Sequence, residues 1–259
     1  MIRVTKIQIP GLETRKPRRL YVCTPKDYET SGRRYPVLYM FDGHNVFYDR
    51  HATYGKSWGM REYLAKAKLP LILVAVECNP EGNRRLNEYT PWAFNRRGVG
   101  RIEALGRTTM DWITGQLKPE IDRAYRTLPD RDHTLIAGSS MGGLMSLYAV
   151  LADNDVFSRA AVISPSLWVD RQKMNRLIAD TPLRQPTRIY MDCGTGECTE
   201  GERAGMLNTL FDTARRLTKA GCEVAVRTVP GGRHCEADWE KRIPVWMDYL
   251  MPETAEEIE

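Results

Sequence analysis

A serine between small residues stands out in the segment GSSMG at positions 138 to 142, which joins two apolar stretches. The pattern glycine-x-serine-x-glycine between a strand and a helix is typical of a nucleophilic serine on a sharp turn. Glycines two positions before and after Ser140 leave room for that turn. The backbone N–H of Met141 then lies in the first turn of a helix, where it can stabilise an oxyanion. A glycine-rich turn without chemistry is the alternative.

A serine hydroxyl needs a base, and the base needs a carboxylate that orients it. After a nucleophile of this type the acid and then the histidine follow, each on a loop behind a later strand. His234 lies in VPGGRHCEADW, between the last predicted strand and the last predicted helix. For the acid we favour Glu197, in the loop GTGECTEGE, over Asp192, which is still near the end of the strand RIYMDC.

A second oxyanion donor is expected from the loop after an early central strand. The segment LYMFDGHNVF supplies it, because Gly43 permits a tight turn and the backbone N–H of His44 can then point toward the serine. His133 begins the strand that ends at Ser140, so we expect it at the opposite edge of the sheet. His51 has no comparable context.

Short apolar runs alternate with stretches of helical periodicity, which is typical of βαβ units. We therefore predict an α/β fold: a mostly parallel central sheet of about eight strands, with helices on both faces. The predicted helices are residues 58–67, 108–127, 141–152, 170–179, 202–219 and 237–250, and Pro119 should kink or break the second. Residues 79–107 show no clear periodicity, and we expect an ordered loop at the rim of the site. We expect a single domain over residues 1–259.

Charge, hydropathy and cysteine spacing exclude several classes of protein. The net charge is +5, but the basic residues are scattered, which argues against nucleic acid and mildly favours an anionic substrate. No segment resembles a secretory signal or a membrane span, so we expect a cytoplasmic protein without membrane contact. Cys193, Cys198, Cys235 and His234 lack the spacing of a zinc site, so neither a metal nor a cofactor is expected.

Seven segments together resemble, in order, the "esterase D" type family that includes enterochelin, feruloyl and acetylxylan esterases. They are YPVLYMFDGHNVF, GKSWGM, ILVAVECNPEGNRRLNEYTPW, GSSMGGLMSLYAV, VFSRAAVISPSLWVD, YMDCGTGE and GGRHCEADW. The resemblance implies an α/β-hydrolase fold with Ser140 as nucleophile, His234 as base and the N–H groups of Met141 and His44 as oxyanion donors. It leaves the acid open, because family members vary there.

The sequence thus predicts a carboxylic ester hydrolase that works through an acyl-enzyme, with Ser140, His234 and Glu197 as its triad. The substrate would be a small acyl, sugar, feruloyl or siderophore ester. Two alternatives stay open: an acyltransferase of the same fold, and a hydrolase-fold binding protein without catalysis. A homo-oligomer is equally compatible with the sequence. Trp58, Trp92 and Trp168 are interpreted as core or rim residues rather than catalytic ones.

Overall fold

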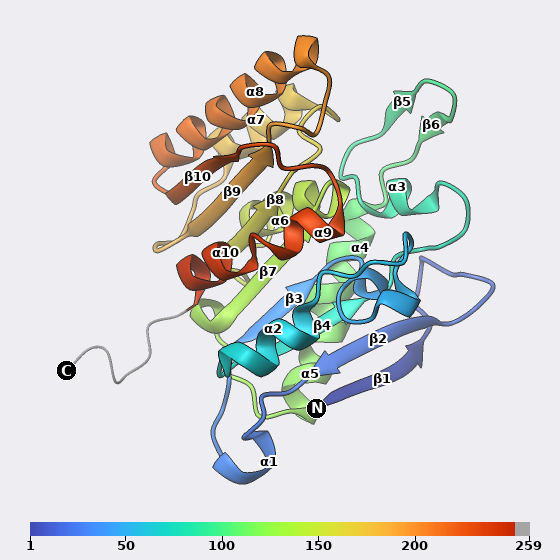
Figure 1. Cartoon of the computed structure of the whole chain (residues 1–259), viewed down its shortest axis with the longest axis vertical. Helices are drawn as coiled ribbons and strands as arrows, with labels where there is room; N and C mark the ends of the chain where they lie inside the picture. The colour runs from blue at the N-terminus through green and yellow to red at the C-terminus, as the bar shows by residue number, and fades with distance from the viewer. Residues whose placement is uncertain (252–259) are drawn as a thin grey trace.

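The computed structural model describes residues 1–251, and its main feature is an eight-stranded sheet in the order β1-β2-β4-β3-β7-β8-β9-β10 (Figure 1). The strands are β1 (Ile2–Ile7), β2 (Arg18–Cys23), β3 (Val37–Met40), β4 (Ile72–Val76), β7 (Thr134–Ser139), β8 (Arg159–Ile163), β9 (Arg188–Gly194) and β10 (Glu223–Val229). Within this sheet only β1 with β2 and β2 with β4 pair antiparallel. The predicted fold class, a mostly parallel sheet of an α/β-hydrolase, is confirmed.

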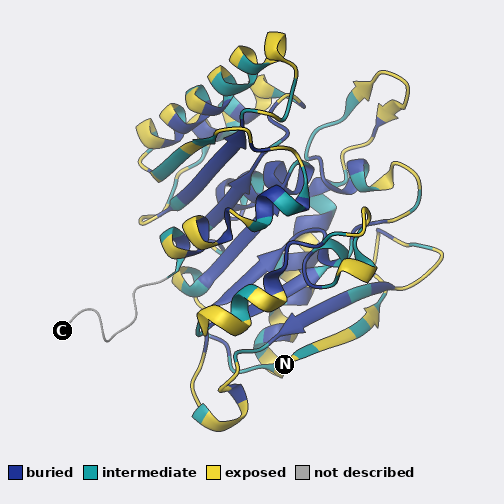
Figure 2. Cartoon of the chain, viewed as in Figure 1, coloured by how far each residue is buried: buried dark blue, intermediate teal, exposed yellow. Residues whose placement is uncertain are grey.

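Helices cover both faces of this sheet, as expected. The longer ones are α2 (Met60–Ala67), α4 (Gly106–Trp112), α5 (Lys118–Ala124), α6 (Met141–Ala152), α7 (Arg171–Asp180), α8 (Glu200–Lys219) and α10 (Ile243–Leu250). One apolar layer packs α4 to α8 against the sheet, and the other packs α2 and α10 against the opposite face. The inner strands are consequently buried along most of their length (Figure 2).

Two predicted helices are interrupted, each next to a proline. The predicted helix 108–127 is divided into α4, a π-helical turn (Ile113–Leu117) and α5, with Pro119 in the first turn of α5. The prediction of one helix over 237–250 was wrong. This stretch holds two helices, α9 (Glu236–Glu240) and α10, and Pro244 lies in the first turn of α10. Proline is tolerated in a first turn because its missing N–H has no intrahelical acceptor there.

Residues 79–107, expected to be an ordered loop at the rim of the site, contain a helix and two strands. It holds the short helix α3 (Arg84–Glu88) and a hairpin of β5 (Phe94–Arg96) with β6 (Gly100–Ile102), which projects beyond the main sheet (Figure 1). The hairpin was missed because two three-residue strands are too short for periodicity to show. Another short helix, α1 (Tyr28–Ser31), was also not predicted. No helix among residues 1–251 is long and apolar enough to cross a bilayer.

Candidate active site

Ser140 lies at a sharp turn between β7 and α6. Its backbone has φ 59° and ψ −121°, a conformation that L-residues rarely adopt and that marks functional sites. The surrounding glycines are required by space: a Cβ on Gly138 would lie 2.6 Å from backbone atoms of Gly142, and one on Gly143 would lie 2.8 Å from the carbonyl oxygen of Ile163. Met141 is the first residue of α6, so its N–H belongs to the positive end of that helix.

His234 and Glu197 contact each other. His234 lies in the loop between β10 and α9, and its Nδ1 is 2.9 Å from Oε2 of Glu197, which follows β9. The imidazole is 41% exposed, whereas the Glu197 side chain is 3% exposed, so the carboxylate reaches the histidine from below the surface. The Trp239 indole packs edge-on against the imidazole with ring centres 4.9 Å apart. Because Glu197 occupies Nδ1, Nε2 is the nitrogen left for a proton from serine.

The other oxygen of Glu197 is held by a separate set of donors. Oε1 accepts hydrogen bonds from Ser164 Oγ at 2.6 Å and from the N–H of Gly194 at 2.6 Å, and Arg242 Nη2 lies 3.3 Å away. Burial alone would raise the pKa of Glu197, but the hydrogen bonds from His234, Ser164 and Gly194 outweigh it and lower that pKa below its ordinary value. The carboxylate is thus ionised at neutral pH and fixed in orientation.

Asp192 is placed differently, although it was the alternative acid. It lies within β9 with a fully buried side chain, and it accepts hydrogen bonds from Arg242 Nη1 at 2.9 Å and from Tyr190 Oη at 3.1 Å. Burial raises its pKa in spite of the Arg242 charge. Asp192 therefore supports Arg242 from beneath, and the histidine contact belongs to Glu197. Arg242 itself was not anticipated from sequence; an arginine beside the apolar segment IPVWM was the available signal.

The loop after β3 carries His44 and is fastened at several points. Asp42 has a left-handed backbone (φ 57°), and its N–H donates to Tyr89 Oη at 3.1 Å. Arg85 donates from Nε and Nη2 to the two oxygens of Asp42 at 2.6 and 2.7 Å. His44 lies in a single 3₁₀ turn (η1, Gly43–Asn45), and its Nε2 is 3.0 Å from Thr53 Oγ1. The imidazole of His44 is thus engaged on the loop, away from Glu197.

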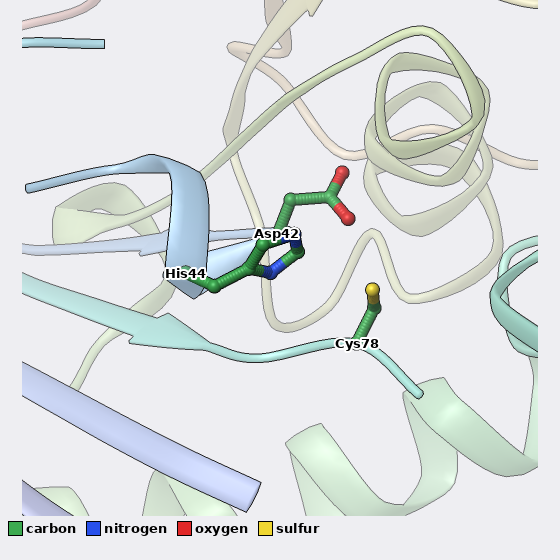
Figure 3. A group of neighbouring side chains, drawn as sticks. All are labelled: Asp42, His44 and Cys78. Carbon is green, nitrogen blue, oxygen red and sulfur yellow. The ribbon is translucent and has the colours of Figure 1, made fainter. Parts of the chain in front are cut away.

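Asp42, His44 and Cys78 form a group of metal-ligand type, with their ligand atoms within 4.8 Å of one another (Figure 3). A metal ion does not fit this donor set. Arg85 already occupies both carboxylate oxygens and adds a positive charge. Burial also raises the pKa of the Cys78 thiol well above its usual value, whereas a metal binds the thiolate. We interpret the group as part of the support of the loop.

Two cavities meet at Ser140 and His234. The apolar lobe, about 820 Å³, is lined by Met141, Pro165, Leu167, Trp168, Met206 and Leu210 together with Arg85, Arg96 and Arg171. The polar lobe, about 700 Å³, is lined by Asp42, His44, Asn45, Thr53, Asn79 and Glu236. Ser140, His234 and Arg85 belong to both lobes, and each lobe has the volume of a small-molecule site. Asn45 Nδ2 donates to Glu236 at 2.9 Å, which joins the His44 loop to α9.

Among the remaining sequence candidates, His133 and Trp58 line neither lobe, whereas His51 lines the polar lobe. His133 stands at the start of β7, the opposite end from Ser140, and its Nδ1 contacts Asp130. His51 Nδ1 is 3.0 Å from Tyr21 Oη. Trp58 is buried and stacks on Trp239.

The two other tryptophans differ in position: Trp168 lines the apolar lobe, and Trp92 lines neither lobe. Trp92 packs edge-on against Tyr148, and Trp168 is 59% exposed at the rim of the apolar lobe. Neither contacts the reacting groups named above.

Comparisons with known proteins agree on one family. A family model described as "Putative esterase" matches residues 12–248. The protein YbbA of Bacillus subtilis is 28% identical over 187 residues, 71% of this chain and 70% of that protein. Esterase Rv1288 of Mycobacterium tuberculosis is 34% identical over 131 residues, which cover 49% of this chain and 24% of that protein. The crystal structure of an IroE-like serine hydrolase from Shewanella oneidensis matches with a TM-score of 0.76 at 19% identity, covering 96% of this chain and 79% of that one.

Proposed function

The chain belongs to this esterase family and is a serine esterase, and on that premise we propose that Ser140, His234 and Glu197 form its catalytic triad. The observation that carries the proposal is the pairing of a strained Ser140 with His234 in the same two cavities, with Glu197 bound to the far nitrogen of that histidine. Each group has the environment that its role needs. The base is partly exposed, the orienting carboxylate is buried, and the nucleophile lies at the N-terminus of helix α6.

In the proposed reaction Ser140 Oγ attacks the carbonyl carbon of the ester, while His234 Nε2 takes the hydroxyl proton. The carbonyl oxygen becomes an oxyanion held by the N–H groups of Met141 and His44. The tetrahedral intermediate collapses, the C–O bond to the alcohol breaks, and the alcohol leaves with the proton from His234. A water molecule then attacks the acyl-enzyme and gives its proton to His234. The bond between the acyl carbon and Ser140 Oγ breaks, His234 returns the proton to Oγ, and the carboxylic acid leaves.

The substrate we propose is a small ester with one part in each lobe. The lobes have similar volumes but different linings, one largely apolar and one rich in hydrogen-bonding groups. This fits an ester whose acyl and alcohol parts differ in polarity better than a uniformly apolar lipid.

Replacement of the nucleophile tests the assignment. Ser140→Ala should lower the turnover of p-nitrophenyl acetate and butyrate at least about 1,000-fold, because the members of a triad act as a unit. The matched control is Ser139→Ala, which removes the neighbouring hydroxyl at the variable position of the motif and should retain most of the activity. Near wild-type turnover in Ser140→Ala would contradict the proposal.

A further inference from the structure

Arg85 has a guanidinium edge that its structural contacts do not use. Nε and Nη2 bind the carboxylate of Asp42, and the ring of Tyr89 lies 5.1 Å from the guanidinium carbon. Nη1 forms no hydrogen bond with any described residue, although the side chain is 28% exposed. Since Arg85 lines both lobes beside Ser140, its remaining N–H groups lie where a bound ester would be.

The apolar lobe contains a second arginine, Arg96, which differs from Arg85 in having no carboxylate partner among the described residues. Arg96, on β5 of the projecting hairpin, forms no ion pair within residues 1–251, and its guanidinium carbon lies 5.8 Å from the ring centre of Trp168. Phe94 packs edge-on against the same indole at 5.5 Å, so the hairpin positions Arg96 at the rim. A third arginine of the lobe, Arg171, is paired with Asp212.

The acidic residues of the lobe do not neutralise these two arginines. Glu197 is 3% exposed and engaged by His234, Ser164 and Arg242. Glu202 accepts hydrogen bonds from Thr199 at the start of α8, where it closes a capping box. Asp42 offsets the charge of Arg85, but Arg85 Nη1 still offers N–H donors. An anion in the lobe would therefore meet these donors at the Arg85 base and a positive charge at the Arg96 rim, between apolar walls.

The geometry points to an anion-binding subsite in the apolar lobe, formed by Arg85 at its base and Arg96 at its rim, which selects esters that carry a carboxylate or similar negative group away from the scissile bond. This inference rests on the proposed esterase function and adds the substrate class: an ester of an apolar chain that ends in an anionic group. An arginine whose Nε edge is already fixed loses little side-chain entropy when it binds such a group.

A pair of esters of nearly equal size tests this inference. The substrates are mono-p-nitrophenyl adipate, which ends in a carboxylate, and p-nitrophenyl methyl adipate, in which that end is a neutral methyl ester. We expect wild-type kcat/KM to be about tenfold higher for the anionic ester, the size of one charge-assisted hydrogen bond. The preference should shrink as salt concentration rises, because exposed charges are screened.

Four variants separate recognition of charge from support of the loop. Arg85→Gln and Arg96→Gln should each reduce the ratio of the two kcat/KM values toward one, mainly through a higher KM for the anionic ester. Arg97→Gln is the matched control, because Arg97 is an exposed neighbour on the same hairpin that lines neither lobe. Asp42→Asn removes the partner of Arg85 but leaves its charge, so it should lower activity on both esters without reducing the ratio.

The outcomes are distinguishable. A wild-type ratio near one, or a ratio that neither arginine variant changes, would overturn the anionic subsite while leaving the esterase intact. An equal loss on both esters in Arg85→Gln, with no change in the ratio for Arg96→Gln, would show that Arg85 only holds the loop and would also overturn it. If wild type hydrolysed neither ester, the proposed function itself would fail. Arg96 is exposed, so its variant keeps the test valid if Arg85→Gln does not fold.

Discussion

Glu197 and Asp192 lie near the carboxyl end of the same strand and both contact Arg242, yet only one of them reaches the histidine. Asp192 is still within β9, so its carboxylate is directed into the interior, between Arg242 and Tyr190. Glu197 lies beyond the strand, and its longer side chain spans from Arg242 and Ser164 on one oxygen to His234 on the other. The comparison shows that position relative to the strand end, rather than acidity, decides which carboxylate contacts His234.

Of the two acids, Glu197 should have the larger effect on activity when its charge is removed. Glu197→Gln keeps the shape but places an amide against His234 Nδ1, which no longer stabilises the imidazolium and can favour the wrong tautomer. We expect kcat to fall at least about 100-fold in p-nitrophenyl butyrate hydrolysis. A loss smaller than that of Asp192→Asn would transfer the role of the acid to Asp192.

Asp192→Asn should instead act mainly on stability. The amide can still accept the hydrogen bond from Tyr190, but Arg242 loses a buried charge partner and retains Glu197. We expect the free energy of unfolding, measured with urea, to fall by about 3 kcal/mol, as when one partner of a buried pair is removed. The kcat of the folded variant should stay within about tenfold of wild type.

Ser164→Ala should weaken the support of Glu197 without removing its charge. Ser164 has a left-handed backbone (φ 45°), donates to Glu197 Oε1 and accepts hydrogen bonds from the Trp239 indole at 3.0 Å and from Arg242 at 3.0 Å. Loss of the hydroxyl leaves two buried donors without this acceptor. We expect kcat to fall about tenfold with KM nearly unchanged, since the hydroxyl is engaged by Glu197, Trp239 and Arg242. A change confined to KM would contradict this role.

The smallest of these effects should be on the pH dependence of stability, where the two acids act with opposite sign. The pKa of Glu197 is lower in the folded state than its ordinary value of 4.5, so the unfolded state binds the proton more tightly. Its contribution to stability is present above pH 4.5 and is lost as the pH falls through the lower, folded-state pKa. Glu197→Gln should therefore flatten the decline of urea midpoints below pH 4.5. For Asp192, whose pKa is raised, the sign is opposite.

The sequence predicted those parts of the molecule that have a local pattern, namely the buried strands and the glycine-rich turn at Ser140. Strands covered on both faces appear as apolar runs, and the nucleophile turn carries its own glycines, so the sheet and the position of Ser140 at the end of β7 follow from local pattern. Arg242 could not be assigned in the same way, because its contacts with Asp192 and Glu197 join segments about 50 positions apart. The link of Asp42 with Arg85 depends likewise on tertiary packing.

Active-site labelling with a fluorophosphonate probe tests the central claim most directly. The nucleophile assigned here should form a covalent phosphonyl adduct, and peptide mass spectrometry should place that adduct on Ser140 within the segment GSSMG. Wild type should be labelled stoichiometrically and Glu197→Gln much more slowly, whereas Ser140→Ala should not be labelled. An adduct on Ser139 or on another residue, or undiminished labelling of Ser140→Ala, would contradict the account.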